Sequence, residues 1–324
     1  MCLVALALDQ SRRFPLVLAS NRDEYFKRPA ARLAWWTPRP GDPAVLGGRD
    51  LESGGTWLGL TAQGRLALVT NVRGGMAVDA NAPTRGRIVT EWLAARESTG
   101  DFWMRTALSG YNGFNLIAAD FQRGECYWAS NTVAYPMRLE RGVYGLSNGG
   151  LDAPWPKVQA LKARLSSAMD EAPAVDELAS RLFAALADRS PAPDADLPQT
   201  GIPLEWERQL SSAFIRTSDQ AYGTRCSTLI IAERTGRRLI THVLERTFNA
   251  GAAVALLRRS TLRDWPPRYT DEPASGAFEQ AVVSESELSP IAPAAPTLAK
   301  KTRVRSLLKP APGGRRRNTT FGAL

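Results

Sequence analysis

The chain of 324 residues contains few residues that bind metals or form cross-links, with only three cysteines and one histidine. This supply is too small and too scattered for a conventional zinc site. A low, odd number of cysteines also argues against a disulfide framework and for a reducing compartment. We therefore expect no bound metal, no cofactor and a cytoplasmic location.

Long hydrophobic runs are missing as well. No apolar stretch approaches the roughly 20 residues that a membrane span needs. The apolar run of residues 3–8 is too short for a signal peptide, and no basic segment precedes it. The chain has no Gly-x-Gly-x-x-Gly motif, and Gly59 and Gly64, which have P-loop spacing, are followed by Arg65 and Leu66 instead of the phosphate-binding Lys and Ser/Thr. We expect a soluble protein without a phosphate-binding loop.

Charge is unevenly distributed along the chain. The net charge is +9, and residues 251–324 hold 12 Lys/Arg against 6 Asp/Glu. We predict a globular domain over residues 1–250 and a basic, Pro/Ala-rich, disordered tail over residues 251–324. The basic cluster of residues 300–317 suits RNA, membrane or acidic partners, although a solvated tail without a function is favoured. The domain itself is not strongly basic, so we expect no nucleic-acid partner for it.

The first residues predict a buried hairpin. Residues 2–8 are apolar on both alternating faces, which indicates a strand covered on both sides. After a polar turn, the run of residues 16–19 can return beside it. That hairpin would bring the segment from Ser20 to Asp23 back towards Cys2.

Cys2 is a candidate nucleophile. Removal of Met1 would leave a thiol and a free α-amine on one residue, with reference pKa values of about 8.5 and 7.7–8.0. The neutral amine can then take the proton of the thiol, and no histidine is needed. Asp23, close to the new terminus, would hold the amine. The alternative is a small buried cysteine in a first strand, with Asn-Arg-Asp-Glu as a solvated turn.

The remaining pattern predicts antiparallel hairpins at both ends of the domain and helices in the middle. Residues 31–55 are interpreted as loop. Such an order does not fit a doubly wound parallel sheet and favours antiparallel sheets covered by helices. Further strands are predicted at residues 56–60, 66–70, 114–119, 125–129, 143–146, 224–232 and 238–247, and helices at 84–96, from 154 onward and at 174–187.

A serine nucleophile is the rival. Residues 145–149 match the Gly-x-Ser-x-Gly elbow around Ser147, and Asp219 and His242 follow in the order of an esterase triad. An elbow must run directly from a strand into a helix, whereas glycines and prolines intervene here. His242 also lies within a predicted strand. The serine esterase is therefore a second alternative.

Seven short motifs occur in an order that resembles a known family. They are Met1-Cys2, Asn21-Arg22-Asp23-Glu24, Gly54-Gly55-Thr56-Trp57-Leu58-Gly59, Thr70-Asn71, Tyr111-Asn112-Gly113-Phe114-Asn115-Leu116, Tyr144-Gly145-Leu146-Ser147-Asn148 and Tyr222-Gly223-Thr224-Arg225. Together they resemble the NRDE family, the relatives of transport and Golgi organisation protein two, over residues 1–247. The family is placed among the N-terminal nucleophile (Ntn) hydrolases. The resemblance implies an α+β fold with an α/β/β/α four-layer sandwich of two antiparallel sheets.

The same resemblance implies roles for individual residues. Cys2 would attack an amide carbon, and Asp23 would hold its amine. Fixed donors are needed for the oxyanion, and a nearby guanidinium favours thiolate. The catalytic set implied is Cys2, Asp23, Asn71 for the oxyanion, Asn148 for orienting amine and substrate, and Arg225 for lowering the thiol pKa; the substrate-binding set is Asn21, Arg22 and Trp57.

Two positions depart from the pattern. The acylase branch of these hydrolases has an arginine where this chain has Ser20, and we expect Arg22 to supply that charge from the opposite face of the strand. The strand that normally closes the family's chain after Thr247 is replaced here by Ala- and Arg-rich sequence.

The sequence thus favours an amidohydrolase that acts on a non-peptide C–N bond of a small molecule. The first alternative is a non-catalytic carrier of haem or of a lipid or acyl chain on the same fold, because members of the family have been linked to haem and lipid handling. The substrate and the oligomeric state stay open.

Overall fold

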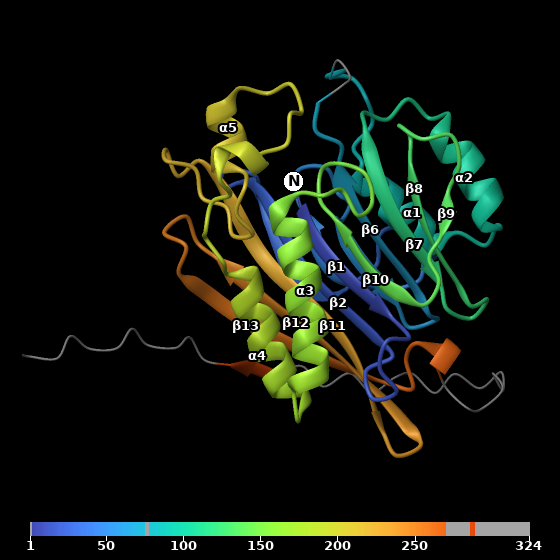
Figure 1. Cartoon of the computed structure of the whole chain (residues 1–324). Coiled ribbons are helices and arrows are strands. Elements are labelled where there is room, and N and C mark those ends of the chain that lie inside the picture. The colour runs from blue at the N-terminus through green and yellow to red at the C-terminus, as the bar shows by residue number, and fades with distance from the viewer. Residues whose placement is uncertain (1, 75–77, 270–285, 289–324) are drawn as a thin grey trace, which may run out of the picture. The chain divides into compact units, whose positions relative to one another are not determined.

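The computed structural model describes residues 2–74, 78–269 and 286–288, and every structural statement below refers to these residues (Figure 1). The predicted disorder of most of the tail and the basic cluster of residues 300–317 lie outside them. Among the described residues, no helix combines the length and the apolar composition that crossing a membrane requires.

Sheet A contains the start of the chain as its second strand, next to the edge strand. All its neighbouring strands are antiparallel. Its order is β10 (Gly142–Leu146), β1 (Cys2–Leu8), β2 (Leu16–Tyr25), β11 (Tyr222–Thr235), β12 (Arg238–Phe248), β13 (Val254–Arg263) and β14 (Ser286–Leu288).

Sheet B is an antiparallel meander in chain order. It consists of β3 (Ala30–Trp36), β4 (Val45–Asp50), β5 (Leu58–Thr61), β6 (Arg65–Asn71), β7 (Phe114–Asp120), β8 (Glu125–Ser130) and β9 (Met137–Arg138). The prediction of loop over residues 31–55 is wrong because β3 and β4 lie there. Glycine in β4 hid the strand, yet it is needed: a Cβ on Gly47 would lie 2.5 Å from the carbonyl oxygen of Leu58 in β5.

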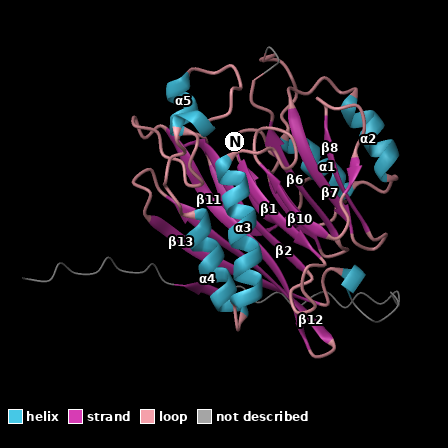
Figure 2. Cartoon of the chain, in the orientation of Figure 1, coloured by secondary structure: helices cyan, strands magenta, loops and turns pink. Residues whose placement is uncertain are grey.

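Helices cover the outer face of each sheet, as Figure 2 shows for α3 and α4. The helices are α1 (Gly86–Ala94), α2 (Thr99–Ala107), α3 (Pro156–Glu171), α4 (Val175–Leu186) and the short α5 (Leu204–Gln209). Side chains of α3 and α4 pack on sheet A, and those of α1 and α2 pack on sheet B. A third apolar cluster fills the space between the two sheets. The four-layer α/β/β/α fold is confirmed.

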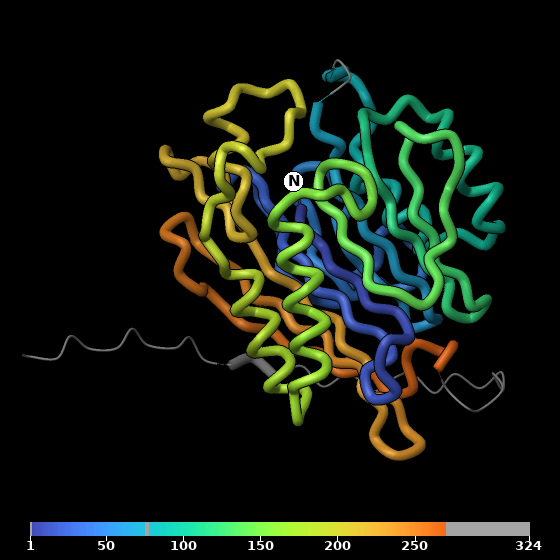
Figure 3. Tube along the Cα trace, in the orientation of Figure 1, coloured from blue at the N-terminus to red at the C-terminus, as the bar shows by residue number. Residues whose placement is uncertain are grey.

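The predicted N-terminal hairpin is confirmed and sets the site. Cys2 lies opposite Arg22, and Leu8 lies opposite Leu16. Figure 3 shows this hairpin behind α3 and α4. Val4 and Leu6 point into the space between the sheets, while the alternate residues pack against the helices. Cys2 shares the intersheet face of β1 because side chains alternate along a strand.

The fold continues beyond residue 250, so the prediction that the tail begins at 251 is wrong, as is the expected loss of the closing strand. β13 pairs with β12 over residues 254–263. Two arginines masked its strand pattern, and both charges are partnered: Arg258 donates to the Leu33 carbonyl at 2.8 Å, and Arg259 pairs with Asp176 at 2.9 Å. Beyond β13, Trp265 is 2% exposed and donates to the Thr61 carbonyl.

Candidate active site

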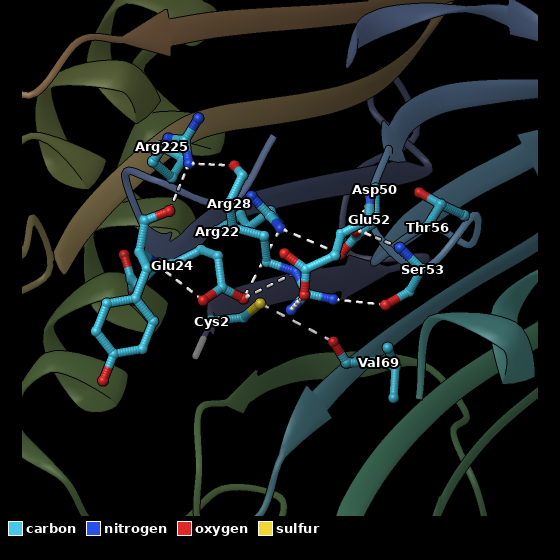
Figure 4. A network of polar contacts seen from close by, with 12 residues as sticks. Cys2, Arg22, Glu24, Arg28, Asp50, Glu52, Ser53, Thr56, Val69 and Arg225 are labelled. Atoms are coloured by element: carbon cyan, nitrogen blue, oxygen red, sulfur yellow. Dashed lines mark hydrogen bonds and ion pairs between the residues drawn. The ribbon is translucent and has the colours of Figure 1, made fainter. Parts of the chain in front are cut away.

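Cys2 is held at the first position of β1, between the two sheets. Its side chain is buried, with 7% of the residue exposed, and its Sγ lies 3.9 Å from the carbonyl oxygen of Val69 in β6 (Figure 4). The hydroxyl of Ser147 donates to the Cys2 carbonyl at 2.9 Å. The start of the chain is therefore fixed by contacts to both sheets.

Burial raises the pKa of the Cys2 thiol above its usual value. The positive amino terminus of the chain opposes this rise, and Arg22 opposes it further, whereas the charge of Asp23 adds to it. The thiol is thus a neutral group whose ionisation depends on the charged groups around it.

Asp23 lies deep at the end of β2, on the helix-facing side. Its Oδ1 accepts a 2.7 Å bond from the Thr224 hydroxyl, and its main-chain oxygen accepts a 2.9 Å bond from Tyr222. Burial raises the pKa of the Asp23 carboxyl, while the positive chain terminus and Lys157 lower it. The Asp23 carboxylate and the Cys2 thiol are therefore close enough for the charge of Asp23 to act on the thiol. Its role in holding a terminal amine stays a prediction.

Asn148 and Asn71 are brought together at the ends of β10 and β6. Nδ2 of Asn148 donates to the Asn71 carbonyl at 2.8 Å, and the Thr70 hydroxyl donates to the Ser147 carbonyl at 2.6 Å. Asn148 is fully buried. Its amide fixes the segment that carries Asn71, so its effect on a substrate would pass through that segment.

Arg22 lies directly opposite Cys2 across the hairpin. Its guanidinium stacks 4.2 Å from the Trp57 ring centre, and it forms long ion pairs of 3.8 Å with Glu24 and 3.7 Å with Asp50. The expectation that Arg22 faces away from the position of Ser20 is wrong. β2 stays regular through both residues, and positions two apart on a strand share a face.

Arg225 does not take the predicted role beside the thiol. Its guanidinium donates to the carbonyls of Tyr25 and Arg28, at 2.7 and 2.9 Å, and lies over the Phe26 ring. A bulge in β11 between Thr224 and Cys226 interrupts the register at this residue. Arg225 therefore holds the end of β2, and the arginine that acts on the Cys2 thiol is Arg22.

Asn21 leaves the predicted substrate-binding set. It is fully buried on the helix-facing side, where Nδ2 donates to the carbonyls of Leu186 and Ala213, both at 2.9 Å. Its Oδ1 accepts a bond from the Ser227 hydroxyl. These contacts use its amide to join β2 to α4 and β11.

A group of buried charged residues lies beside Asp23 that the sequence pattern did not predict. Nζ of Lys157 donates to the Leu210 carbonyl at 2.7 Å, and burial lowers the pKa of Lys157 to about 8. Arg73 pairs with Glu207 at 2.7 Å, with both side chains about 5% exposed or less. One signal was present: Lys157 continues the four-residue spacing of Leu161 and Leu165 on the buried face of α3.

The serine esterase alternative is wrong. His242 lies on β12, four strand positions from β10, which places it roughly 19 Å across the sheet from the Ser147 end. Its Nδ1 is 2.8 Å from Arg259, and the Asp219 carboxylate accepts from the Thr217 hydroxyl. No triad can form from these three residues.

A cavity between the sheets is lined in part by Trp57. It measures about 10 Å³ and is lined mainly by glycine and apolar residues, with Glu245 as its charged group. A space of this size admits a single water molecule. Within the described part of the chain, no cluster of three or more His, Cys, Asp or Glu residues could hold a metal ion.

The fold and site define a class: a four-layer α+β protein whose first strand carries a buried cysteine close to a buried aspartate. The chain belongs to the Transport and Golgi organisation 2 (TANGO2) family, whose model matches residues 1–250. It is 34% identical over 256 residues to the Transport and Golgi organization protein 2 homolog of Bos taurus, covering 73% of this chain and 90% of that one. The Homo sapiens homolog is 32% identical over 254 residues, with the same coverage.

A solved structure with a similar fold is the Caenorhabditis elegans N-acylethanolamine-hydrolyzing acid amidase ortholog. It is 10% identical, with a TM-score of 0.42, and the match covers 71% of this chain and 92% of that one.

Proposed function

We propose that this protein is an N-terminal nucleophile amidohydrolase that cleaves a non-peptide C–N bond of a small molecule. The observation that carries the proposal is a buried cysteine at position 2, the first residue of β1, whose thiol and the buried Asp23 carboxylate influence each other's ionisation. The mechanism requires removal of Met1, so that Cys2 itself supplies the amine. A reactive thiol also needs a reducing compartment, which suits the cytoplasm.

In the first half-reaction, the neutral α-amine of Cys2 takes the thiol proton as Sγ bonds to the amide carbon. The carbonyl oxygen becomes an oxyanion, and the side-chain amide of Asn71 is the donor proposed for it. When the C–N bond breaks, the ammonium returns its proton to the leaving amine. Cys2 is left as a thioester.

In the second half-reaction, water attacks the thioester and gives its proton to the same α-amine. Collapse of the intermediate releases the carboxylic acid and restores the thiol. Asp23 holds the amine in position through both steps, and Thr224 fixes Asp23 by its 2.7 Å hydrogen bond. Arg22 assists by favouring the thiolate, since it lowers the thiol pKa.

One observation favours the second candidate, a carrier of haem or of an acyl chain. Burial is the largest influence on the Cys2 thiol and raises its pKa, and a neutral thiol suits a pocket wall better than a nucleophile. Haem ligation by Cys2 would give a thiolate-type absorption spectrum. A spectral titration with haem on the wild type and on Cys2→Ala tests this candidate, which requires a haem spectrum that changes in the variant.

The test of the hydrolase is the intact mass of the purified protein before and after treatment with a thiol-reactive amide analogue. We expect loss of Met1 and one adduct, located at Cys2 by peptide mapping. Cys226→Ala, which removes another buried cysteine, should leave the adduct unchanged. Retention of Met1 in the mature protein would contradict the mechanism outright.

A further inference from the structure

Arg22 is a buried cation whose hydrogen-bonding capacity is not filled. It is 5% exposed, and within the described residues its Nη1 has no hydrogen-bond partner. Leaving a buried donor unpaired is costly, and more so when the group is charged. Such a donor next to a nucleophile indicates that a ligand supplies the missing acceptor.

The two nearest carboxylates are already committed to other donors. Asp50 accepts from Arg28 at 2.7 Å and from the main-chain amides of Glu52 and Ser53, both at 3.0 Å. Glu24 accepts from the amide of Tyr25 at 2.9 Å. Both lie 3.7–3.8 Å from Arg22, which is beyond hydrogen-bond distance. They attract the guanidinium without satisfying it.

The arginines around Arg22, together with Arg22 itself, outnumber the carboxylates by one. Arg28 and Arg85 act on Glu24, and Arg225 acts on both Glu24 and Arg22. Figure 4 shows Arg22, Arg28 and Arg225 around the carboxylates of Glu24, Asp50 and Glu52. With Arg85, which acts on Glu24, four arginines face three carboxylates at this end of β2. One additional monoanion would balance the group.

The geometry points to a carboxylate as that anion. Trp57 covers one face of the Arg22 guanidinium, and the N–H donors point outward in its plane, so an acceptor bonds at the planar edge. A carboxylate matches this edge with two parallel hydrogen bonds. Cys2 and Arg22 are opposed across the hairpin, and the charge of Arg22 acts on the Cys2 thiol, so an anion bound to Arg22 would lie close to the carbon that Cys2 attacks.

We infer that Arg22 is the specificity-determining residue of the proposed hydrolase. Its substrate would be an amide with a carboxylate close to the scissile bond, as in an N-acyl amino acid. That the bound anion is part of a substrate rests on the proposed function. The anion site itself rests on Arg22 and its surroundings.

The experiment measures how fast iodoacetamide alkylates Cys2 in the full-length protein, with and without a matched ligand pair. The pair is N-hexanoylglycine, which carries a carboxylate, and its uncharged primary amide. We expect the carboxylate to slow alkylation about 10- to 100-fold more than the amide at equal concentration, from the usual strength of charged hydrogen bonds. Arg22→Gln should remove this difference, and Arg22→Lys should restore only part of it.

Arg28→Gln is the matched control, because Arg28 is a neighbouring arginine that is already bonded to Asp50, Glu52 and Ser53. It should keep the preference for the carboxylate. Equal protection by both ligands, no protection by either, or an equal loss in both variants would overturn the inference. Circular dichroism melts of each variant verify that it is folded.

Turnover of the same pair separates this inference from the proposed function. Carboxylate-specific protection without hydrolysis would sink the hydrolase and leave the anion site standing. Equal hydrolysis of the acid and of the amide would keep the hydrolase and refute the role of Arg22.

Discussion

Asn21 and Arg22 are consecutive residues of β2 that face opposite layers, and their surroundings differ in kind. On the helix side, the Asn21 amide makes three hydrogen bonds and is fully buried. On the intersheet side, Arg22 is almost as deeply buried but has only two long ion pairs and an unpaired nitrogen. Native proteins rarely leave a buried charge so poorly bonded. The helix side of the strand is therefore bonded for stability, and the intersheet side is the one on which we propose a ligand.

The largest effect should come from the cysteines that flank Arg22 on this intersheet side. Cys2 lies opposite Arg22 on β1, and Cys226 lies opposite it on β11. Only Cys2 adjoins the chain terminus, so Cys2→Ala should reduce kcat by a factor on the order of 10⁶, to background. Cys226→Ala should keep kcat within roughly threefold, measured on the same amide. Comparable losses in the two variants would show that the terminal amine has no part in the reaction.

A buried ion pair near Asp23 should show the next largest effect. Arg73→Met would leave Glu207 charged and buried, which costs about 3–5 kcal/mol of unfolding free energy. Urea denaturation at pH 7 measures the loss. Arg208→Met, which breaks an exposed pair with Asp194, should change the midpoint little. A small loss in Arg73→Met would mean that water reaches this group.

The contrast between Asn21 and Arg22 predicts smaller changes in the unfolding free energy, with a clear loss for one variant and little loss for the other. Asn21→Ala should lower the unfolding free energy by about 2–3 kcal/mol, because three buried partners lose their bonds. Arg22→Gln should cost less than about 1 kcal/mol, since it removes a charge that is poorly compensated. Denaturant melts of both variants test the contrast. If Arg22→Gln proves the more damaging change, the intersheet side is structural after all.

Local patterns predicted most of the fold, and they failed where neighbours from distant segments decide. The hairpin of β1 and β2 followed from two short apolar runs and one polar turn. β13 was missed because Arg258 and Arg259 look incompatible with a covered strand until Leu33 and Asp176 are placed beside them. The strand β4 was missed because its glycines meet the close approach of β5, which no local pattern reveals.

The site was predictable to the same extent. The family resemblance grouped Cys2 with Asp23 and Asn148. In the structure the charge of Asp23 acts on the Cys2 thiol, and Ser147, the neighbour of Asn148, bonds to the Cys2 carbonyl. Arg225 lies elsewhere because a bulge in β11 changes the direction of its side chain, and a single sequence does not reveal a bulge. Lys157 on α3 meets Asp23, and Glu207 on α5 meets Lys157, only through the packing of these helices.

The smallest effect concerns Lys157, which places a charge on the otherwise well-bonded helix side. Its pKa is about 8 in the folded chain, below the usual 10.5. Between these values the unfolded chain binds more protons, so the unfolding free energy should rise with pH, by about 1 kcal/mol from pH 8 to pH 9. Lys157→Met should remove this rise, whereas Lys162→Met on the same helix, which pairs with Asp152 at 2.6 Å, should retain it. Urea melts at the two pH values give the difference between each variant and the wild type. An identical rise in Lys157→Met would show that the ammonium keeps its proton through its bond to the Leu210 carbonyl, and the helix side would then tolerate a full buried charge.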